Sequence, residues 1–250
     1  MHDKPVALVT GANKGIGRQI ARELAAKGLT VLVGSRDLAK GEEAAADIGG
    51  DAIAIQLDVT NEASIAPAAE RIQTEFGRLD VLVNNAGIAS TAEPGTSFEE
   101  RLKQNVPSTA SMDYIRAIYE TNVFGLMAVT KAMLPLLRQA PAGRIVNLGS
   151  SSGSLTLNAN PTFEYRHVFG AAYSPSKATV HAVTLAFAIE LENTNIKVNA
   201  ACPGFTATDL NGFRGTRSVE QGARQAVRLA LLGPDGPTGT FSDEDGPVAW

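Results

Sequence analysis

The chain has 250 residues, a formal net charge of −4 and 44% hydrophobic residues. This length suffices for one domain with a large core, and the dispersed basic residues favour neither a nucleic-acid-binding nor a membrane-surface protein. No apolar run approaches the roughly 20 residues that span a bilayer, and no secretion signal is visible. The lone cysteine, Cys202, excludes an intramolecular disulfide. We therefore expect a single cytoplasmic domain over residues 1–250.

Apolar runs and amphipathic stretches alternate along the chain. The apolar runs predict strands at residues 6–9, 29–34, 52–57, 79–84, 144–148, 196–201 and 239–242. The stretches with helical spacing predict helices that begin near Ile16 and others at residues 38–48, 62–76, 112–138, 173–191 and 218–232. Strands that alternate with helices form parallel sheets with right-handed crossovers. The order predicts an α/β fold, a single doubly wound Rossmann-type sheet of about seven strands with helices on both faces.

Two long segments fit this alternation poorly. Residues 92–111 are rich in Pro, Ser, Thr and Glu, and residues 152–172 contain several Asn, Pro and aromatic residues. We interpret both as loop insertions, and long loops in compact domains often carry function. The first segment is equally consistent with a tolerated surface loop. For the second we favour function, because it directly precedes Tyr173.

The first predicted strand leads into a glycine-rich turn, residues 10–17, with the sequence TGANKGIG. Glycines at positions 11, 15 and 17 allow a sharp turn and a close approach to a ligand, while the first N–H groups of the following helix are free to bind an anion such as pyrophosphate. The spacing departs from the Gly-x-Gly-x-x-Gly dinucleotide fingerprint. By itself it also fits a simple tight turn between a strand and a helix.

Further motifs follow this turn in a fixed order: Asn84-Asn85-Ala86-Gly87, Asn122, Ser150, Tyr173-x-x-x-Lys177 and Pro203-Gly204. Together with the glycine turn they resemble the short-chain dehydrogenase/reductase family, from about Val6 to the C-terminus. Within that family the chain looks most like the NADPH-dependent carbonyl reductases. The resemblance implies four catalytic residues, Asn122, Ser150, Tyr173 and Lys177.

The chemistry expected of these residues centres on Tyr173 and Lys177. Four residues apart on a helix, they share one face, so the ammonium can lower the pKa of the phenol. The resemblance implies that Tyr173 gives a proton to the carbonyl oxygen and that Ser150 donates a hydrogen bond to it. It also implies that Lys177 contacts the nicotinamide ribose and that Asn122 supports a water that relays protons to the lysine.

Each of these residues has a structural alternative. A Tyr-x-x-x-Lys pair occurs on many helices without a catalytic role, and residues 150–152 are three serines that fit an ordinary turn. The rival tyrosine, Tyr165, has Phe169 rather than a lysine four positions on. Gly149 stands where many members of the family have another serine.

The same matching assigns the cofactor-binding residues. They are Gly11, Asn13, Lys14, Gly15, Ile16, Gly17, Ser35, Arg36, Asp58, Val59, Asn85, Ala86, Gly87, Tyr173, Lys177, Pro203, Gly204, Thr206 and Thr208. Asp58 is expected to accept from the adenine amino group, and its alternative is a helix cap before Glu62, for which Thr60 and Asn61 are better suited.

Residues 34–37, Gly-Ser-Arg-Asp, predict the choice of cofactor. A carboxylate that binds the ribose hydroxyls of NAD is expected at the position of Ser35 and is missing. Ser35 can accommodate a 2′-phosphate, which Arg36 and Lys14 can grip. We therefore predict NADPH/NADP. In the alternative, both cations are ordinary surface residues and Asp37 serves NAD.

The predicted function is hydride transfer from NADPH to a ketone or aldehyde, with a small-molecule carbonyl substrate as the partner. Alternatives are a hydroxysteroid or alcohol dehydrogenase, a β-ketoacyl reductase, and a dinucleotide-binding sensor without turnover. No metal is expected, because the histidines at 2, 167 and 181 are scattered. His167 is either a substrate contact or a solvated loop residue. A monomer is slightly favoured over a dimer or tetramer.

Overall fold

The computed structural model describes residues 3–93 and 95–250. Seven strands form one sheet: β1 (Val6–Val9), β2 (Thr30–Ser35), β3 (Ala52–Gln56), β4 (Val81–Asn84), β5 (Arg144–Leu148), β6 (Lys197–Ala201) and β7 (Phe241–Ser242). Their order is β3-β2-β1-β4-β5-β6-β7, and each neighbouring pair is parallel. This confirms the predicted doubly wound sheet, in which the chain reverses direction across the sheet after β3.

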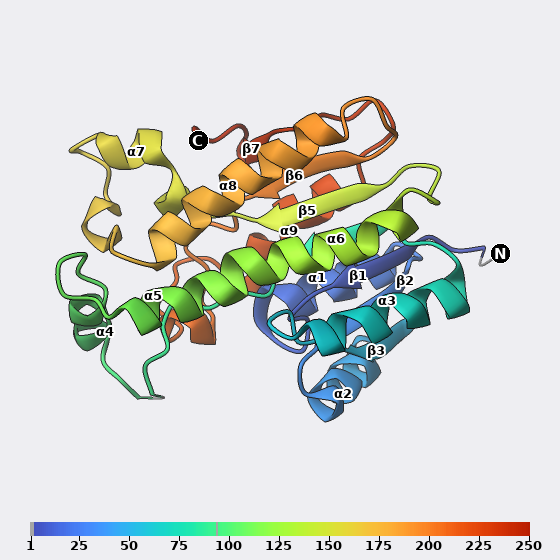
Figure 1. The fold of residues 1–250 in the computed structure, drawn as a ribbon, viewed down its shortest axis with the longest axis horizontal. Coiled ribbons are helices and arrows are strands. Elements are labelled where there is room, and N and C mark those ends of the chain that lie inside the picture. The colour runs from blue at the N-terminus through green and yellow to red at the C-terminus, as the bar shows by residue number, and fades with distance from the viewer. Residues whose placement is uncertain (1–2, 94) are drawn as a thin grey trace.

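Helices cover both faces of the sheet (Figure 1). Those that flank the sheet are α1 (Gly15–Ala26), α2 (Leu38–Ile48), α3 (Glu62–Phe76), α6 (Leu126–Leu137), α8 (Tyr173–Glu190) and α9 (Val219–Ala230). One buried cluster joins the sheet to α3, α6 and α8, and a second joins it to α1, α2 and α9. The two layers arise because successive strand residues point to opposite faces.

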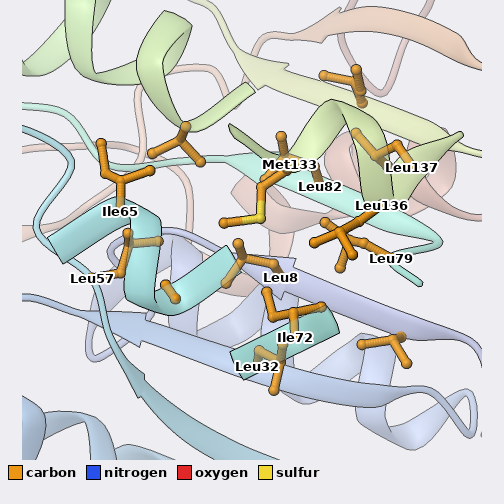
Figure 2. Close-up of a cluster of buried hydrophobic side chains, with 14 of the residues drawn as sticks. Leu8, Leu32, Leu57, Ile65, Ile72, Leu79, Leu82, Met133, Leu136 and Leu137 are labelled. Carbon is orange, nitrogen blue, oxygen red and sulfur yellow. The ribbon is translucent and has the colours of Figure 1, made fainter. Parts of the chain in front are cut away.

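Strand β1 shows this alternation directly. Leu8 lies in the first cluster, where Figure 2 shows it between Leu82 of β4, Ile72 of α3 and Met133 of α6. Its neighbours Ala7 and Val9 lie in the second cluster. Burying a side chain of leucine size contributes about 1.5–3 kcal/mol. A strand that is apolar on both faces therefore has to be central in the sheet.

The helix predicted at residues 112–138 is confirmed as one helical stretch, with a π-helical turn inside it. It consists of α5 (Met112–Tyr119), a π-helical turn (Glu120–Gly125) and α6. The turn lies against the loop after β3, where a Cβ atom on Gly125 would be 2.8 Å from both the carbonyl oxygen and Cγ2 of Val59. Helical periodicity cannot reveal this close approach, and π-turns inside helices are frequent at functional sites.

The prediction that the two long segments fit poorly into regular elements is wrong in part. The first holds α4 (Phe98–Gln104) and the second holds α7 (Leu155–Ala159). Ser97 and Glu100 form a complete capping box at the start of α4, a signal present in the sequence. Both helices lie at the end of the molecule where α5 and α8 begin (Figure 1). In the described part of the chain, no helix has the length and apolar character to cross a bilayer.

Candidate active site

The glycine turn after β1 is held by Asn85, which follows β4. The Asn85 side-chain amide donates to the Thr10 and Gly11 carbonyl oxygens, at 2.9 and 3.1 Å, and the Thr10 hydroxyl accepts from the backbone N–H groups of Asn85 and Ala86. A Cβ atom on Gly17 would lie 2.3 Å from that amide nitrogen. Glycine is therefore required at position 17 for this contact.

The same turn leaves space and donors for a phosphate. Gly11 and Gly15 have φ values of 61° and 56°, in the left-handed region. Helix α1 begins after Lys14, and no side chain in the described part of the chain is bonded as its cap, nor is there an acidic residue in its first turn. The open N–H groups of this 12-residue helix fit the pyrophosphate of a dinucleotide.

The loop after β6 covers this helix start from the opposite side. A Cβ atom on Gly15 would lie 3.6 Å from Cγ2 of Thr208. Thr206 is buried, and its hydroxyl donates to the Pro203 carbonyl oxygen at 2.9 Å. Gly204 has a φ of 68°, so the Pro203-Gly204 turn also requires the left-handed region. These predicted cofactor residues therefore converge with the glycine turn on one edge of the sheet.

The residues expected to bind the 2′-phosphate lie nearby and differ in exposure and in their partners. Arg36 follows β2 and is exposed, whereas Ser35 is only 2% exposed and donates its hydroxyl to the Asp37 carbonyl oxygen at 2.7 Å. The Lys14 ammonium forms an ion pair with Asp209 in the loop after β6. Asp37 accepts from the backbone N–H of Lys40 and caps α2, which supports Arg36 over Asp37 as the ribose-end residue.

Asp58 does not cap the helix that follows it. Its carboxylate accepts from the backbone N–H and the hydroxyl of Thr60, at 3.0 and 2.8 Å, while the Asn61 side chain caps α3. Asp58 and Val59 lie directly after β3, at the carboxyl edge of the sheet. The alternative role of Asp58 as a helix cap is thereby excluded.

The four predicted catalytic residues come from three elements that meet at this edge. Tyr173 and Lys177 lie on the first turns of α8, Ser150 follows β5, and Asn122 lies in the π-turn. The Lys177 ammonium donates to the Leu148 carbonyl oxygen at 2.7 Å and lies 5.9 Å from the centre of the Tyr173 ring.

Asn122 ties the loop after β4 to the first turns of α8. Its side chain exchanges two hydrogen bonds with the backbone of Ile88, at 2.8 and 2.9 Å, and donates to the Ser176 hydroxyl at 3.0 Å. Ser176 in turn donates to the Tyr173 carbonyl oxygen at 2.7 Å. A Cβ atom on Gly87 would lie 3.3 Å from the Asn122 side-chain oxygen and 3.7 Å from the Lys177 ammonium.

The model of the short chain dehydrogenase family matches residues 5–218. The chain belongs to this family. It is 36% identical to the short-chain dehydrogenase anuI of Penicillium roqueforti, over 92% of this chain and 90% of that protein. It is 33% identical to rat carbonyl reductase [NADPH] 1, over 99% of both chains. Among solved structures, salutaridine reductase of Papaver somniferum superposes with a TM-score of 0.79 at 32% identity, over 95% of this chain and 99% of that one. The predicted family and fold are confirmed.

In this short-chain dehydrogenase, burial dominates the ionisation of Tyr173 and Lys177, the candidate catalytic pair. Burial raises the pKa of Tyr173 to about 12, against a lowering effect of its hydrogen bond with Ser150. Burial also lowers the pKa of Lys177 to about 8. The expected lowering of the phenol pKa by Lys177 is therefore wrong, because the pKa of Tyr173 is raised overall. The ammonium lies over the ring and donates to the Leu148 carbonyl oxygen, and burial is the largest influence on the pKa of the phenol.

His181 is a residue of the site that the sequence did not indicate. It lies one turn after Lys177, is 3% exposed, and its Nε2 accepts from the backbone N–H of Ser150 at 3.3 Å. Its ring packs on Phe241 and Trp250, with centroids 4.0 and 5.7 Å away. His181 therefore supports the backbone at Ser150, the candidate catalytic serine.

His181 also explains the glycine at position 149. A Cβ atom there would lie only 2.7 Å from the Nε2 atom of His181. We expect Gly149→Ser to destabilise the protein by about 1–3 kcal/mol, because the core is already filled. The free energies of unfolding in urea are compared for Gly149→Ser, His181→Ala and the double variant. His181→Ala should relieve part of the loss caused by Gly149→Ser, and strictly additive losses in the double variant would contradict the collision.

The buried imidazole also predicts an acid sensitivity. Burial, with a smaller effect of the Lys177 charge, lowers the pKa of His181 to about 4 from 6.5. Between these values the unfolded chain binds the extra proton, so stability should fall as the pH drops from 6.5 toward 4, by up to about 3 kcal/mol. Urea unfolding across this range should give a flatter profile for His181→Gln. Equal slopes for both proteins would contradict this assignment.

The remaining candidates, Tyr165 and His167, lie in the second long segment. Tyr165 contacts the rings of Phe163 and Phe205, at 5.8 and 6.0 Å between centroids. His167 is exposed, with Nδ1 2.9 Å from the Glu164 carbonyl oxygen. Within residues 3–93 and 95–250, no group of three His, Cys, Asp or Glu side chains is placed to hold a metal ion.

Proposed function

We propose that this chain reduces the carbonyl group of a small ketone or aldehyde, with NADPH as the electron donor. Relatives that carry the names carbonyl reductase [NADPH] and salutaridine reductase support this class of reaction. The observation that carries the proposal is the meeting of Tyr173, Lys177, Ser150 and Asn122 beside a glycine turn that suits a dinucleotide.

Ser150, Tyr173 and Lys177 have separate roles in the reaction at the carbonyl oxygen. NADPH, when bound, supplies a hydride to the carbonyl carbon. The Ser150 hydroxyl donates a hydrogen bond to the oxygen as negative charge grows there, and Tyr173 gives it a proton. Lys177, with a pKa of about 8, is still largely cationic at neutral pH and stabilises the phenolate that remains.

The ionisation of Tyr173 suits the role of a proton donor in carbonyl reduction. A phenol with a pKa of about 12 is protonated at neutral pH and ready to donate. Oxidation requires a phenolate as the base, and this burial makes the phenolate scarce.

The experiment is a panel of ketones and aldehydes with NADPH, followed by the loss of NADPH absorbance. We expect turnover of at least one carbonyl compound, accompanied by formation of its alcohol. Tight NADPH binding without consumption over a broad panel would favour the dinucleotide-binding sensor instead.

For the assembly we propose a monomer. Light scattering at micromolar concentration should give the mass of one chain, 26.1 kDa. Three apolar side chains, Phe124, Leu185 and Ile189, are exposed on the π-turn and α8. A stable dimer or tetramer would contradict the proposal and point to this face.

A further inference from the structure

Helix α8 carries the catalytic tyrosine as its first residue, yet its own sequence does not fix where it begins. The N-cap position is Ala172, whose methyl group cannot cap a helix. The third helical position is Pro175, so a capping box is impossible. The start of α8 therefore has to be held by another part of the chain.

Asn105, at the end of α4, makes this contact. Its backbone carbonyl oxygen accepts from the Ala171 N–H at 2.7 Å, and its side-chain oxygen accepts from the Ala172 N–H at 3.0 Å. A Cβ atom on Gly170 would lie 2.2 Å from the Asn105 side-chain nitrogen. Three consecutive residues before Tyr173 thus pack directly on one asparagine, some 65 positions earlier in the chain.

The segment before α8 packs on α5, and its contact with Asn105 connects the two long segments. Ala172 is fully buried in a small cluster with Tyr114 and Ile118 of α5. Asn105 belongs to residues 92–111, and Gly170 and Ala171 belong to residues 152–172. Helix α5 continues into the π-turn that contains Asn122. The contact between Ala172 and α5 therefore links the start of α8 to the segment that carries Asn122.

We propose that Asn105 is a positioning residue for catalysis, which fixes the start of α8 and thereby the place of the Tyr173 hydroxyl. This inference rests on the proposed carbonyl reduction. The Asn105 side chain acts as a helix cap supplied from a distant segment. A displacement of about 1 Å in a reacting group can cost about 100-fold in rate, so a partial release of the helix start should lower kcat about tenfold or more.

The test compares Asn105→Ala with Asn105→Asp, which keeps an oxygen acceptor at the same place. On a carbonyl compound that the unmodified protein reduces, Asn105→Ala should lower kcat about tenfold or more while the KM for NADPH changes less than twofold. Asn105→Asp should recover most of the rate, because its carboxylate still accepts from Ala172 and suits the start of a helix. Gly170→Ala, which crowds the same junction, should resemble Asn105→Ala.

Asn195 provides the matched control. Its side-chain amide also joins two loops, by donating to the Ala140 and Pro141 carbonyl oxygens, but it precedes β6 and so lies at the opposite edge of the sheet. We expect Asn195→Ala to leave kcat within about twofold. An unchanged kcat for Asn105→Ala, or an equal loss in Asn105→Asp or Asn195→Ala, would overturn the proposal.

Hydrogen exchange separates this proposal from the proposed function. Without any substrate, peptides covering residues 168–176 should exchange faster in Asn105→Ala than in the unmodified protein or in Asn105→Asp. If no carbonyl compound is turned over but this difference is seen, the reaction is wrong and the role of Asn105 at the start of α8 stands. Equal exchange in all three proteins would contradict that role.

Discussion

Tyr173→Phe is expected to lose roughly 100- to 10,000-fold in kcat, the range over which general acid catalysis contributes. The phenol is the group placed to donate a proton at the start of α8, and burial keeps it protonated at neutral pH. The substitution removes only the hydroxyl and leaves the packing of the ring intact. NADPH binding, measured by fluorescence titration, should therefore change little. The measurement is steady-state kinetics on a carbonyl compound that the unmodified protein reduces.

Tyr165→Phe is the matched control for this variant. Tyr165 lies in the second long segment and contacts Phe163 and Phe205 rather than a lysine. Loss of its hydroxyl should change kcat by less than about threefold. If Tyr173→Phe kept the kcat of the unmodified protein, or if Tyr165→Phe lost as much, the assigned proton donor would be wrong.

Arg36→Ala should lower kcat/KM for NADPH about tenfold or more and leave kcat/KM for NADH nearly unchanged. A hydrogen bond to a charged group contributes about 1.5–3 kcal/mol, and about 1.4 kcal/mol corresponds to a factor of ten. Arg36 is exposed directly after β2, where its planar fork can reach a 2′-phosphate. The ratio of kcat/KM for the two cofactors measures this preference.

Two further variants sharpen the cofactor assignment. Lys14→Ala should also weaken NADPH use, although by less than Arg36→Ala, because Lys14 is shared with Asp209. Ser35→Asp should reduce NADPH use by repulsion and cost stability, since Ser35 is buried against α2. Arg116→Ala, which removes an exposed cation of α5 paired with Asp113, is the control and should leave the ratio unchanged. Equal kcat/KM for both cofactors in the unmodified protein would contradict the assignment.

The sheet and its layers could be predicted because their signals are local. Val6 to Val9 is a short run that is apolar on both faces, which is typical of a central parallel strand. The candidate catalytic residues could be proposed because each stands in a motif that resembles one of the family. The helix α4 was also within reach, since Ser97 and Glu100 form a recognisable capping box.

What the sequence could not predict depends on contacts between distant segments. The π-turn inside the 112–138 helix lies where Gly125 meets Val59, more than 60 positions earlier. In the sequence, His181 is simply one position on the apolar face of a buried helix. Only the folded structure shows its contact with the backbone of Ser150. The high pKa of Tyr173 likewise follows from burial, which four-residue spacing to Lys177 does not reveal. The support of α8 by Asn105 has the same origin.

The most direct test of the proposed carbonyl reduction uses NADPH in which deuterium replaces the transferred hydrogen at C4 of the nicotinamide. We expect the alcohol product to gain one deuterium on the former carbonyl carbon, detected by mass spectrometry, and Tyr173→Phe to slow its appearance. NADPH oxidation without deuterium in the product, or undiminished deuterium transfer in Tyr173→Phe, would contradict it.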